Sequence, residues 1–154
     1  MIELTELVLR SVTQLTSASV PDEALATLRP ARRVGPLARP AKFVPVGRAW
    51  RLGELLVTAD GELFSTGRVT RAVVPRDFSA NKSPAEDARR ELQRAAARGP
   101  FPPGDAVNFE YRPAVDQTVF EREGQWMVTL SDAEVALSDY LADRVAFAIT
   151  PGWD

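Results

Sequence analysis

The chain has 154 residues, of which 45% are hydrophobic and 26% charged, with a net charge of −2 and neither histidine nor cysteine. Those two absences exclude disulfides, thiolate and imidazole catalysts, and His- or Cys-ligated metal sites. The composition is that of a globular protein, which we expect to form a single domain over residues 1–154. Because no apolar run approaches the ~20 residues of a membrane span and no signal peptide is evident, we expect a cytoplasmic protein without membrane contact.

The charge is unevenly distributed along the chain. Residues 1–28 carry one basic and four acidic side chains, residues 29–76 carry ten and three, and residues 77–154 carry eight and fourteen. Either folding mixes these segments, or the middle segment forms a basic face for an anionic partner. We favour mixing, because the sequence pI of about 5.3 lies far below that of typical nucleic-acid-binding domains. The dominance of Arg over Lys, with abundant Ala and Pro, suggests a high-GC, bacterial origin.

The N-terminal third is predicted to contain two helices and an extended segment. Residues 2–18 have apolar side chains at helical spacing and predict an amphipathic helix. Pro21, followed by acidic residues, predicts a short second helix over residues 21–28. Four prolines within residues 29–47 disfavour both a helix and a central strand, so we expect an extended, partly polyproline-like crossing segment. It would separate the helical segment 1–28 from an α+β body over residues 48–154.

The body is predicted to begin with strands and then form a helix. Asp60-Gly61 between two apolar runs predicts a hairpin of residues 54–58 and 62–65, and residues 68–74 would extend it to a three-stranded meander. Ser83-Pro84-Ala85-Glu86 is a capping box that predicts a helix ending near Gly99.

The last third is predicted to repeat this order. Residues 107–111 alternate as in a half-buried strand, and Glu123-Gly124 predicts a hairpin of residues 115–122 and 125–130. Residues 131–134 resemble a second capping box, which would start a helix that ends before Pro151. We therefore predict an α+β fold, with a mainly antiparallel sheet of about five to seven strands packed against N-terminal, middle and C-terminal helices.

Arginine supplies the candidate ligand-binding residues. The pattern Gly-Arg-x-x-Arg occurs twice and contributes Arg48, Trp50 and Arg51 from one copy, and Arg68 and Arg71 from the other. Converging guanidinium groups could hold a carboxylate or phosphate, with Trp50 as a wall. However, side chains three apart in a strand point to opposite faces, so solvated strand arginines are the interpretation we favour.

Two further constellations have weaker support. The segment 29–51 could bind nucleic acid, because basic side chains lie near two aromatic ones that could stack on bases. The basic residues are Arg29, Arg32, Arg33, Arg39 and Lys42, and the aromatic residues are Phe43 and Trp50. No known nucleic-acid-binding motif accompanies them. The carboxylates Glu110 and Asp116 could act as an acid–base pair, and Asp139 and Asp143 could bind a hard cation. Both carboxylate pairs are more typical of a solvated surface, and we expect no metal or cofactor.

Three function hypotheses follow, in order of preference. The first is a non-enzymatic binding or interaction domain, expected to be a homo-oligomer, whose interface uses the N-terminal helix, the Pro-rich segment or the near-terminal Trp153. The second is a binding protein or enzyme that holds an anionic small molecule with Arg48, Trp50, Arg51, Arg68 and Arg71. The third, which we disfavour, is nucleic-acid binding through residues 29–51. No catalytic residue is identified.

Overall fold

The computed structural model describes residues 3–76 and 83–151, which contain three helices and twelve strands. The chain divides into two compact units, which we describe separately. Unit 1 consists of residues 1–22, 48–66 and 111–154, and unit 2 of residues 23–47 and 67–110. Strand β4 (Lys42–Leu52) contributes residues to both units.

The fold class is α+β, as predicted. The largest sheet has seven strands in the order β7-β8-β1-β4-β5-β6-β9. The β1–β8 pair is parallel, whereas the other strand pairs described for this sheet are antiparallel. A three-stranded sheet β10-β11-β12 and a two-stranded sheet β2-β3 complete the strands of the described residues. Within residues 3–76 and 83–151, none of the helices has the length and apolar character needed to span a bilayer.

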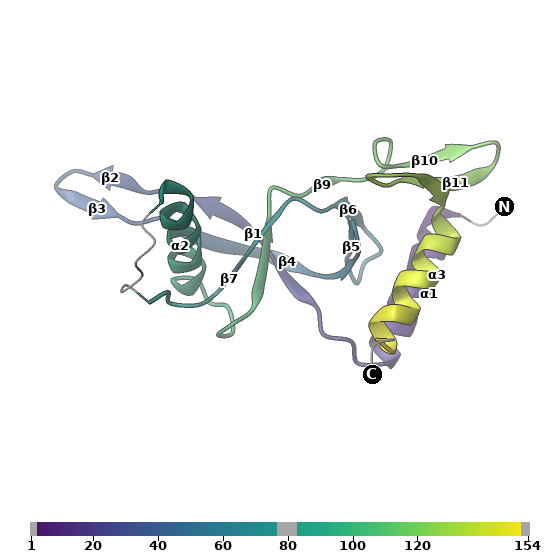
Figure 1. Cartoon of the computed structure of the whole chain (residues 1–154), viewed down its shortest axis with the longest axis horizontal. Coiled ribbons are helices and arrows are strands. Elements are labelled where there is room, and N and C mark those ends of the chain that lie inside the picture. The colour runs from purple at the N-terminus through teal and green to yellow at the C-terminus, as the bar shows by residue number, and fades with distance from the viewer. Residues whose placement is uncertain (1–2, 77–82, 152–154) are drawn as a thin grey trace. The chain divides into compact units, whose positions relative to one another are not determined.

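Unit 1 is built around two helices that pack side by side, α1 (Leu4–Ser17) and α3 (Leu137–Ile149) (Figure 1). Its core joins apolar side chains of both helices to those of the sheets, with Leu15, Leu55 and Leu137 fully buried. Its short strands, besides the end of β4, are β5 (Leu55–Val57), β6 (Leu63–Ser65), β9 (Arg112–Pro113), β10 (Val119–Arg122), β11 (Gln125–Thr129) and β12 (Glu134–Ala136).

The β4–β5 turn of unit 1 is held by Tyr140 of α3. Its hydroxyl donates to the carbonyl of Leu52 at 2.8 Å and accepts from the amide of Glu54 at 2.8 Å. Gly53 between them has φ +65°, and a Cβ there would lie 2.2 Å from the Tyr140 hydroxyl. Burial of the phenol raises the pKa of Tyr140 above its ordinary value.

Unit 2 has its own core between a sheet and one helix, α2 (Pro84–Ala97). Ser83 caps this helix by accepting from the amide of Glu86 at 3.2 Å. Phe43 packs on Phe109, with ring centroids 4.8 Å apart, and Ala95 and Ala96 of α2 belong to the same buried cluster. The strands of unit 2, besides the start of β4, are β1 (Glu23–Arg29), β2 (Arg32–Val34), β3 (Leu37–Arg39), β7 (Arg68–Arg71) and β8 (Ala106–Phe109).

The predicted helix over residues 21–28 is wrong, because these residues lead into strand β1. Ala24, Leu25 and Ala26 are all buried, as in a strand covered on both faces. The acidic residues that suggested a helix start have tertiary partners instead. Asp22 pairs with Arg48 on β4, and Glu23 accepts a hydrogen bond from Asn108 on β8.

The predicted polyproline-like segment 29–47 is also wrong, because it folds into the β2–β3 hairpin and the start of β4. Pro30, Pro36 and Pro40 lie between strands, where no ladder hydrogen bond is needed. Pro45 lies inside β4, but β5 pairs with β4 at Trp50–Leu52, beyond the proline.

Two further local expectations are corrected by long-range pairing. The hairpin of β5 and β6 is confirmed, but β7 does not extend it, because β7 pairs with β8 and β6 pairs with β9. The second capping box is wrong as well: α3 begins at Leu137 after strand β12, and the Ser131 hydroxyl donates to Glu54 at 2.9 Å. The single-domain boundary stays a prediction.

Candidate functional site

Arg48, Trp50 and Arg51 of the first Gly-Arg-x-x-Arg motif lie on β4 in unit 1, where Arg48 and Trp50 bind residues that follow α1. Arg48 Nε donates to the carboxylate of Asp22 at 2.9 Å, and the same guanidinium donates to the Asp22 carbonyl at 3.1 Å. Trp50 is half-buried and its Nε1 donates to the carbonyl of Val20 at 2.9 Å. Arg51 is half-buried in the same strand and also has a partner. These contacts give the motif a structural role.

The second motif lies on β7 in unit 2, beside β8. Arg68 stacks over the ring of Phe109 at 5.0 Å and approaches the Glu110 carboxylate at 3.5 Å. Arg71 donates to the carbonyl of Gly104 at 3.0 Å. Each exposed guanidinium is therefore engaged within its own unit, and a shared anion site of these five residues stays a prediction.

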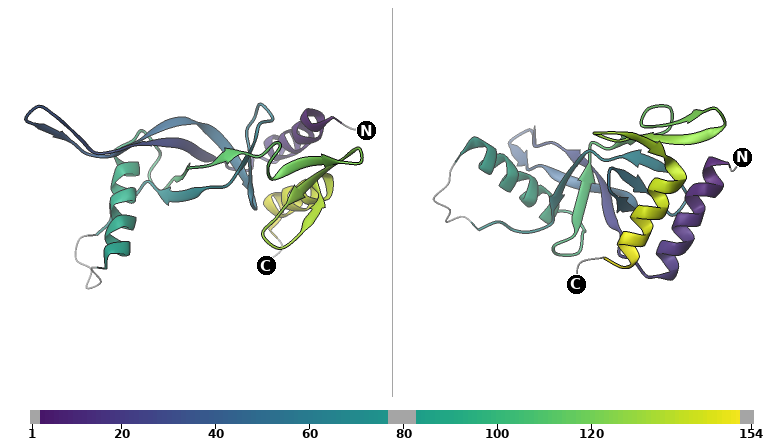
Figure 2. Two further views of the ribbon diagram at one scale, coloured as in Figure 1. Left: turned by 90° about the horizontal axis from the view of Figure 1, so that it is seen from above. Right: turned by 45° about the vertical axis from the view of Figure 1, so that its right-hand side comes forward.

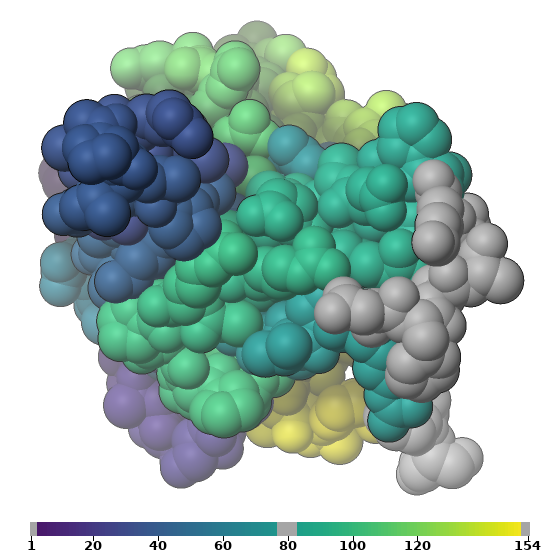
Figure 3. Space-filling view, turned by 90° about the vertical axis from the view of Figure 1, so that its left-hand side faces the viewer, coloured from purple at the N-terminus to yellow at the C-terminus, as the bar shows by residue number. Residues whose placement is uncertain are grey.

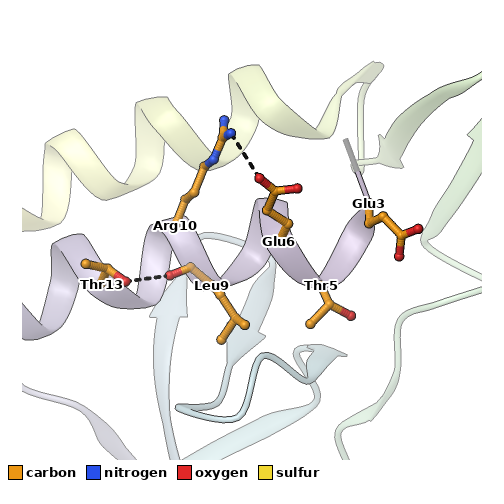
Figure 4. Close-up of a pocket in the computed structure, with 6 residues that line it drawn as sticks. All are labelled: Glu3, Thr5, Glu6, Leu9, Arg10 and Thr13. Carbon is orange, nitrogen blue, oxygen red and sulfur yellow. Dashed lines mark hydrogen bonds and ion pairs between the residues drawn. The ribbon is translucent and has the colours of Figure 1, made fainter. Parts of the chain in front are cut away.

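A shallow depression of about 540 Å³ lies along the outer face of α1 (Figure 4). Three of its polar side chains have partners within α1. Arg10 pairs with Glu6 at 3.3 Å, and the Thr13 hydroxyl donates to the carbonyl of Leu9 at 3.0 Å. The depression is thus the surface of an amphipathic helix rather than a built ligand site.

The β2–β3 hairpin of unit 2 is exposed along its whole length. Residues 30–40 are all exposed, and Figures 1 and 2 show the hairpin extending from β1 and β4 past α2. Gly35, with φ +62°, and Pro36 form a two-residue turn that sets Val34 opposite Leu37. At the base, Arg98 at the end of α2 donates to the carbonyl of Ala41 at 2.7 Å. The hairpin is therefore an exposed two-stranded arm with an anchored base.

The hairpin gathers cations without carboxylate partners. Residues 29–42 contain five basic and no acidic side chains. Within residues 3–76 and 83–151, none of Arg32, Arg33, Arg39 and Lys42 forms an ion pair. An open groove of about 540 Å³ lies along the arm and is lined by Ala31, Arg32, Arg33, Ala38, Arg39 and Pro40.

The register makes the two faces of the hairpin different. Arg32 lies opposite Arg39, and because side chains alternate, Val34 and Leu37 at the tip lie on that same face. Val34 is 48% exposed and Leu37 is 64% exposed. Arg33 faces the other way. One face thus combines a pair of arginines in the middle of the arm with two exposed aliphatic side chains at the tip. Figure 3 shows the hairpin, in blue, open to solvent.

Comparison with protein-family models, curated proteins and solved structures finds no match. Like charges directly opposite each other destabilise a strand pair, and a two-stranded hairpin without a buried face is marginally stable. Neither Arg32 opposite Arg39 nor an exposed Leu37 therefore helps the chain to fold.

The predicted carboxylate sites gain no support from the geometry. Glu110 is exposed, adopts φ +57° and approaches Arg68. Within residues 3–76 and 83–151, no group of three or more acidic side chains is placed to hold a metal ion. Trp153, predicted as an interface residue, lies outside the described residues.

Sequence analysis identified the three arginines of the hairpin and the two cations at its base, Arg29 and Lys42, but not the strands that arrange them. It also missed Val34 and Leu37, because isolated aliphatic residues in a Pro-rich segment carry no periodic signal. The signal that could have found the hairpin is Gly35-Pro36 between two short runs of similar composition, Arg-Arg-Val and Leu-Ala-Arg.

Proposed function

We propose that this protein is a non-enzymatic binding domain that holds nucleic acid through its β2–β3 hairpin. The observation that carries the proposal is the set of exposed arginines Arg32, Arg33 and Arg39, which form no ion pair within the described residues and share an arm without acidic residues. Nucleic acid is the partner class whose regular phosphates match several cations on one strand pair, and β-ribbons are known to lie in either the major or the minor groove of a duplex.

The type of cation also favours phosphate over a carboxylate-rich protein or a bare lipid surface. Four of the five cations in residues 29–42 are Arg, whose planar fork binds phosphate bidentately and stacks on bases. A hairpin that inserted into a membrane interface would typically carry Trp or Tyr, and residues 29–42 contain no aromatic side chain. With this proposal, nucleic-acid binding, which the sequence analysis disfavoured, is preferred over the binding of an anionic small molecule. Homo-oligomerisation stays a prediction beside it.

The test is fluorescence anisotropy with labelled double-stranded DNA, single-stranded DNA and duplex RNA at about 50 mM salt. The hairpin variant is Arg32→Gln/Arg33→Gln/Arg39→Gln. The matched control is Arg10→Gln/Arg89→Gln/Arg122→Gln, which removes the same charge from three exposed arginines that are ion-paired to Glu6, Glu86 and Glu134.

We expect the wild type to bind at least one of these nucleic acids, the hairpin variant to lose at least tenfold in affinity, and the control to stay within about twofold. No binding by the wild type to any of the three refutes the proposal. Equal losses in the two variants also refute it, because binding would then follow net charge rather than the hairpin.

A further inference from the structure

We infer that the hairpin tip is an apolar wedge that enters a base step of duplex DNA from the minor groove and bends the duplex. This inference rests on the proposed function and names the nucleic acid and the mode of contact. Its evidence is the juxtaposition, on one hairpin face, of Val34 and Leu37 at the tip with Arg32 and Arg39 behind them.

The tip cannot read base edges by hydrogen bonding, because Val34-Gly35-Pro36-Leu37 contains no polar side chain. Sequence readout in the major groove uses Arg, Lys, Asn, Gln and acidic side chains, and the tip supplies none of them. Its residue types match those that architectural proteins insert between base steps, which include Leu and Pro. The tip is therefore suited to unstacking a step.

The arginines are placed to hold the wedge in position. They lie two residues behind the tip aliphatics on the same face, about 7 Å along each strand. When the tip enters a step, Arg32 and Arg39 on the two strands lie where they can reach the backbones on either side of it. The narrow minor groove also concentrates negative potential, which favours inserted guanidinium groups.

The turn keeps the wedge compact. Gly35 has φ +62°, and nothing lies within 4 Å of a Cβ built there, so its conformation rather than crowding selects glycine. Pro36 fixes the next φ and adds apolar surface. The base of the hairpin is fixed to the end of α2 by the hydrogen bond from Arg98 to the Ala41 carbonyl.

The test measures bending separately from binding. A DNA duplex of about 30 base pairs with a donor and an acceptor dye at its ends is saturated with protein, and energy transfer between the dyes reports its end-to-end distance. The wedge variant is Val34→Thr/Leu37→Thr, because Thr keeps a high strand propensity. The control is Val46→Thr/Val69→Thr, which changes two exposed valines of unit 2 outside the hairpin.

We expect saturation by wild type and control to raise energy transfer, in accord with a bend of about 20–90°. We expect the wedge variant to bind within about tenfold of the wild-type affinity, with energy transfer near that of free DNA. Wild-type binding without a rise in transfer, or an equal rise with the wedge variant, overturns the wedge while leaving nucleic-acid binding intact. Absence of all nucleic-acid binding removes both proposals.

Two further arms of the experiment separate the rival partners. Duplex RNA of the same sequence should bind more weakly than DNA, because its wide, shallow minor groove does not grip a narrow wedge; a preference for RNA or single strands overturns the inference. Vesicles of phosphatidylserine and phosphatidylcholine test whether the tip inserts into lipid. Sedimentation with vesicles that is lost in the wedge variant, without DNA bending by the wild type, assigns the tip to membranes instead.

Discussion

Removing the cross-strand pair Arg32 and Arg39 should weaken the salt dependence of nucleic-acid binding by a fixed amount. Each cation that neutralises a phosphate of duplex DNA contributes about −0.9 to the slope of log K against log salt. The double variant Arg32→Gln/Arg39→Gln removes two such contacts, so the slope should become less steep by about 1.8.

The slope of the wild type can be bounded from the hairpin. Arg32, Arg33 and Arg39 are exposed, while Arg29 and Lys42 at the base are half-buried. Three to five phosphate contacts correspond to a slope of about −2.7 to −4.5. Between about 50 mM and 200 mM salt, affinity should then fall by roughly 40- to 500-fold.

The assay is an anisotropy titration of one labelled duplex at four or more salt concentrations, with wild type, double variant and a control. The control Arg89→Gln/Arg122→Gln removes two ion-paired arginines and should leave the slope unchanged. A slope unaffected by the loss of Arg32 and Arg39 refutes the reasoning. A wild-type slope much steeper than −4.5 also refutes it, because cations elsewhere in the chain would then contact phosphate.

Three predictions concern the stability of the two units. Gly67→Ala should lower the free energy of unfolding in urea by about 1–3 kcal/mol, because its Cβ would lie 2.2 Å from the carbonyl oxygen of Glu110. The control Gly47→Ala should cost little, because nothing lies within 4 Å of a Cβ there. Equal effects of the two substitutions would contradict this prediction. Tyr140→Phe should cost about 1–2 kcal/mol near pH 7, because two hydrogen bonds of the β4–β5 turn are lost. Burial raises the pKa of Tyr140, so above about pH 10 the folded state keeps the phenol proton that the unfolded state loses. The free energy of unfolding should therefore fall as pH rises above about 10, and it should fall less steeply in the Phe variant. Identical alkaline slopes of the two proteins would contradict this pH prediction. Trp50→Phe should cost about 1 kcal/mol by losing the 2.9 Å bond to the chain after α1, and an unchanged urea midpoint would show that bond to be unimportant.

Sequence reasoning succeeded where structure is determined locally. The helix α1 follows from apolar side chains at helical spacing, and α2 follows from Ser83, whose hydroxyl caps the Glu86 amide as the capping box predicts. The β10–β11 hairpin follows from Glu123-Gly124, both of which adopt positive φ. In each case the residues that encode the element are neighbours in the sequence, so no distant partner is needed to identify it.

It failed where a distant partner decides the outcome. Ala24-Leu25-Ala26 has weak strand propensity, yet it forms a strand because β8 pairs with it far along the chain and Asn108 donates to the carbonyl of Ala24. Ser131 looks like a helix cap, but its hydroxyl donates to Glu54 in the β4–β5 turn. Polar side chains that could cap a helix locally are instead used in tertiary contacts, which a single sequence does not reveal.

The acidic pI weighed against nucleic-acid binding in the sequence-based prediction, but a pI averages over charges that do not act on one another. Hairpin residues from Pro30 to Gly35 extend for about 16 Å along the strand, whereas charges in physiological salt are screened over about 8 Å. Elsewhere arginine and carboxylate neutralise each other in pairs, as in Arg48–Asp22. The field at the hairpin tip is therefore set by its own cations.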